Sequence, residues 1–181
     1  MKFTQTKISD VILVEVPKYI DKRGYLIETY HETIYSDNNI NEKFIQDNQA
    51  FSKKDTLRGL HYQLKYPQGK LVRCIHGAIL DIAVDIRPSS DTYGEWVSAK
   101  LSAANLKQLY IPPGFAHGYL VLSNTAEVIY KCTELYHPED EYGILWNDAD
   151  IGIDWKIKNP ILSNKDKLHP LLKDARNKLF N

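Results

Sequence analysis

One histidine stands in a short segment that has the pattern of a β-strand and is suited to proton transfer. His61 lies in residues 57–63, LRGLHYQ. Histidine is the side chain best matched to taking a proton at neutral pH, because its unperturbed pKa is about 6.5. Strand alternation puts Arg58 and His61 on opposite faces, and Gly59 leaves room for an approaching group. We expect a pocket wall here, although a structural histidine hydrogen-bonded within a sheet is the competing interpretation.

A second histidine follows a turn. Residues 111–118 read IPPGFAHG, and the Pro-Pro-Gly run at 112–114 forces a turn that delivers His117 at the start of a new strand. A histidine in that position can reach the mouth of a cavity. Loop rigidity explains the prolines and the glycine equally well, so this pattern alone leaves structure and function open.

A tyrosine in a third segment is expected to point into the protein. Residues 126–134 alternate as a strand does, and Tyr130 shares a face with Val128 and Cys132. A phenol hydroxyl in such an apolar interior needs a polar partner.

The elements that must hold these side chains are predicted to be β-strands. The clearest strand is 79–86, in which the apolar residues share one face while Asp81 and Asp85 share the other. Residues 70–76 are interpreted as its hairpin partner, joined by a turn at 77–78. Short strands separated by Gly, Pro, Asn and Asp continue from 11 to 135, which is typical of a sandwich or barrel.

Helical patterns are confined to the two ends of the chain. We expect a short helix at 31–39 and a final helix that Pro170 can open. The apolar residues of that final helix would be Leu171, Leu172, Ala175, Leu179 and Phe180. Both helices should pack outside the β core.

Composition indicates one domain and excludes several classes of partner. The 181 residues are 43% hydrophobic, enough for one core, and we expect a single domain over 1–181. Lys plus Arg and Asp plus Glu both number 23, so no bulk charge favours nucleic acid or a membrane surface. Cys74 and Cys132 lie in apolar runs and suit buried thiols in a reducing compartment, which favours the cytoplasm. We find no signal-peptide or membrane-spanning pattern.

Eight motifs in order resemble one enzyme family. They are DKRGYLIE (21–28), FIQDN (44–48), LRGLHYQ (57–63), QGKLVRC (68–74), VDIRPSSDTYGEW (84–96), IPPGFAHG (111–118), ILWND (144–148) and IGIDW (151–155). Together they resemble the dTDP-4-dehydrorhamnose 3,5-epimerase family over about residues 11–166. The resemblance implies an all-β, cupin-like jelly-roll homodimer with short peripheral helices. It also implies an isomerase without a cofactor, which acts on a dTDP-linked 4-keto-6-deoxyhexose in dTDP-rhamnose biosynthesis for cell-surface polysaccharide.

The resemblance assigns four catalytic positions. The family's base falls on His61, and the aspartate that orients it falls on Asp166 in the segment ILSNKD. The proton-donating tyrosine of AEVIYK is Tyr130, and the lysine of QGKLV that contacts the keto region is Lys70. A ketone at carbon 4 acidifies the protons at carbons 3 and 5, so a base on one face and an acid on the other can invert each centre.

The substrate-binding residues are also carried over from the resemblance. They are Arg23, Glu28, Gln46, Asp47, Asn48, Arg58, Lys70, His117, Glu141 and Lys165. Arg23, Arg58 and Lys165 are the cations that a diphosphate requires. Tyr136 is our expected stacking partner for thymine, and without the resemblance the charged residues would be interpreted as solvated loop residues.

Several alternatives stay open. Asp81 could orient Lys70 or His61 in place of Asp166. No metal is expected, because no HxH pair with a following glutamate lets one strand supply two ligands. A 3,4-ketoisomerase or a single-site epimerase would use the same fold and substrate class, and a non-catalytic nucleotide-sugar binding protein is the alternative from another class.

Overall fold

The computed structural model describes residues 1–175, and nearly all of its regular structure is β-strand. The strands are β1 (Lys2–Gln5), β2 (Ile12–Glu15), β3 (Tyr19–Asp21), β4 (Gly24–Leu26), β5 (Gln46–Lys53), β6 (Leu57–Gln63), β7 (Lys70–His76), β8 (Ala78–Asp85), β9 (Trp96–Ser102), β10 (Lys107–Ile111), β11 (Phe115–Val121), β12 (Thr125–Cys132) and β13 (Glu141–Gly143). The helical pieces are short: α1 (Glu32–Ser36) and the 3-10 turns η1 (Pro138–Asp140), η2 (Asp166–Leu168) and η3 (Leu172–Asp174).

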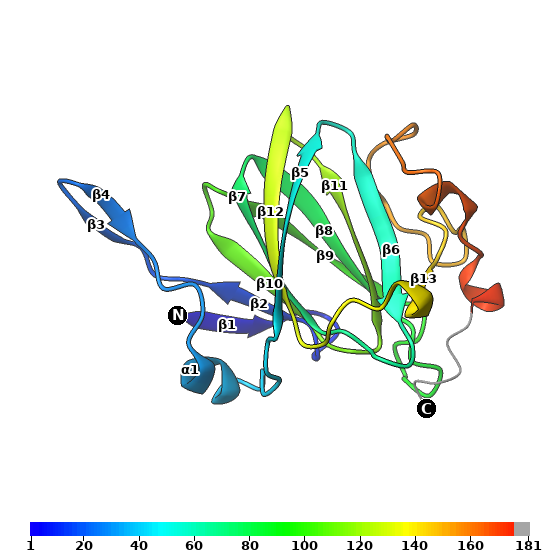
Figure 1. The fold of residues 1–181 in the computed structure, drawn as a ribbon, viewed down its shortest axis with the longest axis horizontal. Coiled ribbons are helices and arrows are strands. Elements are labelled where there is room, and N and C mark those ends of the chain that lie inside the picture. The colour runs from blue at the N-terminus through cyan, green and yellow to red at the C-terminus, as the bar shows by residue number, and fades with distance from the viewer. Residues whose placement is uncertain (176–181) are drawn as a thin grey trace.

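Two antiparallel sheets face each other. One has the order β1-β2-β10-β7-β12-β5 and the other the order β13-β6-β11-β8-β9, while β3 and β4 form a separate hairpin that projects from the body (Figure 1). Chain-adjacent strands such as β7 and β8 lie in opposite sheets, as expected when the chain crosses repeatedly between the two layers of a jelly roll. The predicted all-β jelly roll with short peripheral helices is confirmed.

The main core lies between the two sheets. Val72, Leu109 and Val128 from one sheet meet Ala83 and Phe115 from the other, and all five are buried. Alternate residues on these strands point inward, because successive side chains of a strand point to opposite faces. Cys74 and Cys132 are both buried free thiols, as predicted.

The outer face of the five-stranded sheet is buried as well. Ile82 and Val84 of β8 point away from the first core and pack with Ile151, Trp155 and Leu172 from the segment that follows β13. This C-terminal segment, residues 144–175, lies against the sheet beside β6 and β13 (Figure 1). The strand predicted at 79–86 therefore has two buried faces, and its polar side faces the other sheet.

Three predicted elements differ from the structure. Residues 70–76 and 79–86 are both strands, but they do not pair as a hairpin, because Gly77, with a φ of 74°, passes the chain from one sheet to the other. Residues 31–39 contain the predicted helix, which is only five residues long as α1. The helix expected after Pro170 is the single turn η3 within the described residues, and Leu179 and Phe180 lie outside them.

No helix within residues 1–175 combines the length and the apolar character needed to cross a membrane.

Candidate active site

A cavity of about 450 Å³ opens between the two sheets. Strands β5, β7 and β12 form one wall, while β6, β11 and β13 form the other, together with residues of the C-terminal segment. Ten of the residues predicted as site residues line it: Gln46, Asn48, Arg58, His61, Lys70, His117, Tyr130, Glu141, Lys165 and Asp166. Its volume falls in the range of small-molecule sites, about 300–1,000 Å³.

His61 and Asp166 form a hydrogen-bonded pair at the cavity wall. His61 Nε2 lies 2.7 Å from Asp166 Oδ1, although 105 residues separate them in sequence. Asp166 begins η2, and its backbone N–H donates to Ser163 Oγ, which fixes the turn. Burial alone would raise the pKa of Asp166, but the polar contacts with His169, His61 and Ser163 outweigh burial and hold it well below its usual range. The carboxylate is therefore ionised beside the imidazole.

Tyr130 and Lys70 lie on the six-stranded sheet, opposite the sheet that carries His61. They occupy the neighbouring strands β12 and β7, which pair through Tyr130↔Val72 and Cys132↔Lys70. Burial raises the pKa of Tyr130 to about 12, so its hydroxyl keeps its proton at neutral pH. Burial lowers the pKa of Lys70, although Cys132, Glu141 and Asp81 oppose that shift.

His117 is buried within β11 rather than at the mouth of the cavity. It is 6% exposed, and its Nε2 lies 2.8 Å from Asp81 Oδ1. Burial lowers the pKa of His117 despite the opposing effect of Asp81, so a neutral imidazole donates to the carboxylate. The prediction that Asp81 could orient Lys70 or His61 is wrong. The hydrogen-bond partner of Asp81 is His117.

Arg58 and His61 line the same cavity, which corrects the prediction that they point to opposite faces. The reason is an irregularity where β6 pairs with β11. His61 opposes His117 and Arg58 opposes Tyr119. Three residues along β6 therefore span the same distance as two along β11. An extra residue of this kind shifts the alternation of side chains by one position.

Glu141 links the C-terminal segment to the mouth of the cavity. Lys165 Nζ and the Tyr136 hydroxyl both donate to its Oε2, and its Oε1 lies 4.0 Å from His61 Nδ1. Burial would raise the pKa of Glu141, but these two hydrogen bonds outweigh burial and lower it. Tyr136 is half exposed and lines the cavity.

Three predicted binding residues lie outside the cavity of the single chain. Asp47 is on the outer face of β5, where it pairs with Lys131 at 3.0 Å, because it alternates with Gln46 and Asn48, which face inward. Arg23 is at the tip of the β3–β4 hairpin, bound to Asp21, with its side chain 82% exposed. Glu28 is also exposed, in the chain that follows this hairpin.

Sequence reasoning missed further lining residues. Tyr119 and Gln63 both line the cavity, each two positions after a predicted histidine on the same strand. The alternation of a strand was a sufficient signal for both. Ser163 also lines the cavity, from a loop with no periodic pattern, and its place in the segment ILSNKD, three residues before Asp166, was the signal that could have found it.

Several known proteins of similar sequence share one description. The family model for dTDP-4-dehydrorhamnose 3,5-epimerase matches residues 5–174. The dTDP-4-dehydrorhamnose 3,5-epimerase of Methanothermobacter thermautotrophicus is 50% identical over 169 residues, which cover 92% of this chain and 91% of that protein. The enzyme of the same name from Escherichia coli is 49% identical over 170 residues, which cover 92% of each chain.

A solved structure agrees with these sequence matches. It is the dTDP-6-deoxy-D-glucose-3,5-epimerase of Legionella pneumophila in complex with dTDP-4-keto-L-rhamnose. It is 42% identical to this chain, with a TM-score of 0.94, and the match covers 97% of this chain and 94% of that one. This chain therefore belongs to the dTDP-4-dehydrorhamnose 3,5-epimerase family.

Proposed function

We propose that the protein converts dTDP-4-dehydro-6-deoxy-D-glucose to dTDP-4-dehydro-L-rhamnose, a step of dTDP-L-rhamnose biosynthesis, by inverting carbons 3 and 5 without a cofactor. The observation that carries this proposal is the placement of acid–base groups on both walls of one cavity. His61 with Asp166 lies on one wall, and Tyr130 with Lys70 lies on the other. Inversion needs a base and an acid on opposite faces of the sugar.

His61 is the base in this proposal. An ionised carboxylate can only accept hydrogen bonds, so His61 Nε2 donates to Asp166 and Nδ1 carries the lone pair that takes a proton. The imidazolium formed in this step gains from the neighbouring Asp166 carboxylate. The proton at carbon 3 or carbon 5 is then lost to His61, and the electron pair is delocalised onto the carbonyl oxygen as an enolate.

Lys70 and Tyr130 complete the reaction. The Lys70 ammonium is the positive charge that stabilises the enolate oxygen, and such stabilisation is often the largest part of a rate enhancement. Tyr130 returns a proton from the opposite face, because its raised pKa of about 12 keeps the hydroxyl protonated until the carbanion forms. No metal is needed, since Lys70 supplies the charge.

The remaining lining residues serve binding. Arg58 and Lys165 are the cations available to a diphosphate, and Gln46 and Asn48 offer amide groups from β5. Tyr136, half exposed at the mouth of the cavity, is the proposed stacking partner for thymine. The ligand in the Legionella pneumophila structure supports a dTDP-sugar as the occupant.

We further propose a homodimer in which the β3–β4 hairpin of each copy reaches the other. Tyr19, Ile20, Tyr25 and Leu26 on this short hairpin are 55–73% exposed. A two-stranded hairpin of this size is marginal by itself, so an apolar arm needs a surface to cover it. Such an exchange would bring Arg23 and Glu28 to a second copy's cavity. Sedimentation analysis tests the dimer, and Ile20→Glu is expected to weaken it.

We propose a cytoplasmic location on the basis of the two buried free thiols, and cell fractionation can test it.

The deciding experiment follows dTDP-4-keto-6-deoxyglucose by NMR in deuterated water with the purified protein. Deuterium at both carbons 3 and 5, with a product that a partner reductase converts to dTDP-rhamnose, is the expected result. Deuterium at one carbon would indicate a single-site epimerase, and migration of the ketone would indicate an isomerase. No exchange at all would favour a binding protein. Tyr130→Phe should retain exchange while epimer formation slows.

A further inference from the structure

A second histidine lies beside the pair formed by His61 and Asp166. His169 follows Asp166 by three residues across η2, and in a 3-10 turn such residues lie on the same side. Its Nε2 is 3.6 Å from Asp166 Oδ1, and its ring meets that of His61 edge to face, with centroids 5.5 Å apart. The three side chains therefore converge.

His169 is built into its place and has an unused nitrogen. Its side chain is 8% exposed, and its Nε2 is buried without a hydrogen-bond partner among residues 1–175. A separation of 3.6 Å from Asp166 is too long for a hydrogen bond. Gly143 of β13 lies against the ring, and a Cβ there would come within 2.4 Å of it, so only glycine leaves room. A buried polar atom without a partner is costly and needs an explanation.

The spacing of the three side chains suits a small cation. One ligand atom from each of His61, Asp166 and His169 lies within 4.8 Å of the other two. Ligands of a tetrahedral zinc ion are about 3.3 Å apart, given bond lengths of about 2.0–2.1 Å. The distances from Asp166 Oδ1 to the two imidazole nitrogens, 2.7 and 3.6 Å, lie on either side of that value, so small side-chain movements suffice.

We propose that His61, Asp166 and His169 form a binding site for Zn²⁺. Two imidazoles and one carboxylate match zinc and its transition-metal neighbours, whereas Mg²⁺ and Ca²⁺ prefer oxygen ligands alone. His61 and Asp166 line the cavity, so the fourth coordination position opens toward it. Three protein ligands with one open position is the pattern of an accessible zinc site.

The consequence for activity rests on the proposed role of His61 as the base. A bound zinc ion takes a nitrogen of His61 and separates that residue from Asp166. The site is therefore inhibitory, and zinc competes with catalysis rather than serving it.

Binding is measured first, by calorimetric titration of Zn²⁺ into the metal-stripped protein. We expect one equivalent to bind to the wild type and to His76→Gln, a control that removes an exposed histidine outside the cluster. His169→Gln should weaken binding by at least about tenfold, the loss typical of removing even an outer partner of a metal site. His169→Cys, which supplies a thiolate ligand, should restore tight binding and controls for folding. The proposal fails if the wild type binds no zinc, or if His169→Gln binds zinc as the wild type does.

Activity is measured second, by deuterium exchange in the same proteins. Zinc should inhibit the wild type and His76→Gln reversibly, with activity restored by a chelator. His169→Gln should need at least about tenfold more zinc for half-maximal inhibition, measured relative to its own zinc-free rate, in line with its weaker binding. Mg²⁺ should not inhibit, which separates this effect from chelation of the diphosphate. If zinc binds in a His169-dependent manner without slowing exchange, the metal site stands and the role of His61 fails.

Discussion

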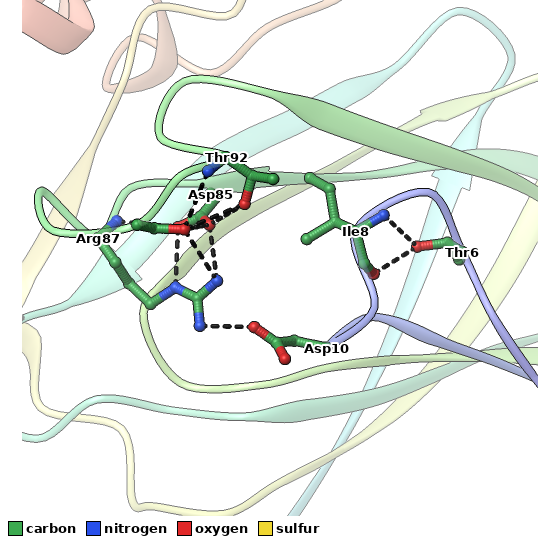
Figure 2. A network of polar contacts seen from close by, with 7 residues as sticks. Thr6, Ile8, Asp10, Asp85, Arg87 and Thr92 are labelled. Carbon is green, nitrogen blue, oxygen red and sulfur yellow. Dashed lines mark hydrogen bonds and ion pairs between the residues drawn. The ribbon is translucent and has the colours of Figure 1, made fainter.

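Strand β8 carries two buried aspartates on one face, and their surroundings differ sharply. Asp85 accepts hydrogen bonds from Arg87 Nε and Nη2, and from the hydroxyls of Ser90 and Thr92, at 2.6–2.9 Å (Figure 2). Asp81, four residues earlier, bonds only to His117, and its Oδ2 is buried without a partner in the described part of the chain. Both are fully buried.

The difference separates a structural end of the strand from a functional one. At the Asp85 clamp, formed by Asp85, Arg87, Ser90 and Thr92, every charge is matched within the loop that follows β8. Arg87 extends the clamp to Asp10 at 2.7 Å, which ties this loop to the N-terminal turn (Figure 2). At the other end, Asp81 holds His117, which lines the cavity, and keeps one buried oxygen without a partner among residues 1–175. A histidine held at a cavity wall by a buried carboxylate is positioned to contact a polar ligand.

The strongest test of this division is to remove the proposed base at the cavity end. His61→Asn should lower the rate of deuterium exchange by about a hundred- to ten-thousandfold, the usual contribution of a placed base. The melting temperature should change little, because His61 is partly exposed at the cavity wall. Exchange by NMR and melting by calorimetry check the two parts. Unfolding of the variant would instead assign His61 a structural role.

Breaking the clamp should have the opposite outcome. Asp85→Asn removes the buried partner charge of Arg87, leaves it paired with the half-exposed Asp10, and should reduce the free energy of unfolding by about 3 kcal/mol. Activity per folded molecule should persist, since the clamp does not line the cavity. Denaturant unfolding and exchange rates measure both, and a variant that is stable but inactive would break the comparison.

The clamp also predicts a dependence of stability on acid. Burial would raise the pKa of Asp85, but the bonds from Arg87, Ser90 and Thr92 outweigh burial and lower it. The stabilisation is therefore complete above the unfolded pKa of about 3.9 and is lost as pH falls through the lower folded pKa. Asp85→Asn should flatten this acid dependence.

An alkaline pH profile sharpens the assignment of Lys70. Burial lowers the pKa of Lys70, so the wild type should lose exchange activity at a lower pH than an exposed lysine would cause. Lys70→Arg keeps its charge. Its exchange rate should be lower than that of the wild type but should change less between about pH 7 and 10. Tyr130 cannot account for this limb, because its pKa is raised to about 12. An unchanged alkaline limb in Lys70→Arg would exclude Lys70.

The smallest effect is expected at the other aspartate of β8. Asp81→Asn keeps a side-chain oxygen that accepts the hydrogen bond from His117. It places an amide N–H group at the position of the unpartnered Oδ2. The free energy of unfolding should change by less than about 1 kcal/mol, far less than for Asp85→Asn. Equal losses in the two variants would show that both ends of β8 are structural.

Much of this fold could be predicted from local patterns. The strands at 70–76 and 79–86 and the inward face of Tyr130 all follow from two-residue alternation. Alternation does not say which strands pair. The hairpin that we expected at Gly77 is a crossing from one sheet to the other. It also fails at the irregularity between β6 and β11, which brings Arg58 and His61 together.

Most residues of the site were predicted from the motif resemblance. The residues that were misplaced or missed have physical explanations. Consecutive strand residues cannot share a face, so Asp47 points outward while its neighbours point inward. Arg23 lies at the exposed tip of the β3–β4 hairpin, away from the cavity of its own chain, and would reach a cavity through the dimer that we propose. His169 belongs to no motif, and only the turn at η2 brings it beside Asp166.

Asp166 reaches His61 from the segment that covers the outer face of the five-stranded sheet. The packing of Ile151, Trp155 and Leu172 that shields this apolar face also holds η2 against β6. During synthesis, the nascent polypeptide can form most of both sheets before this cover exists. Such an intermediate would expose the apolar outer face of the five-stranded sheet, and Asp166 would not lie beside His61. Enzymatic turnover therefore reports that the C-terminal segment has docked.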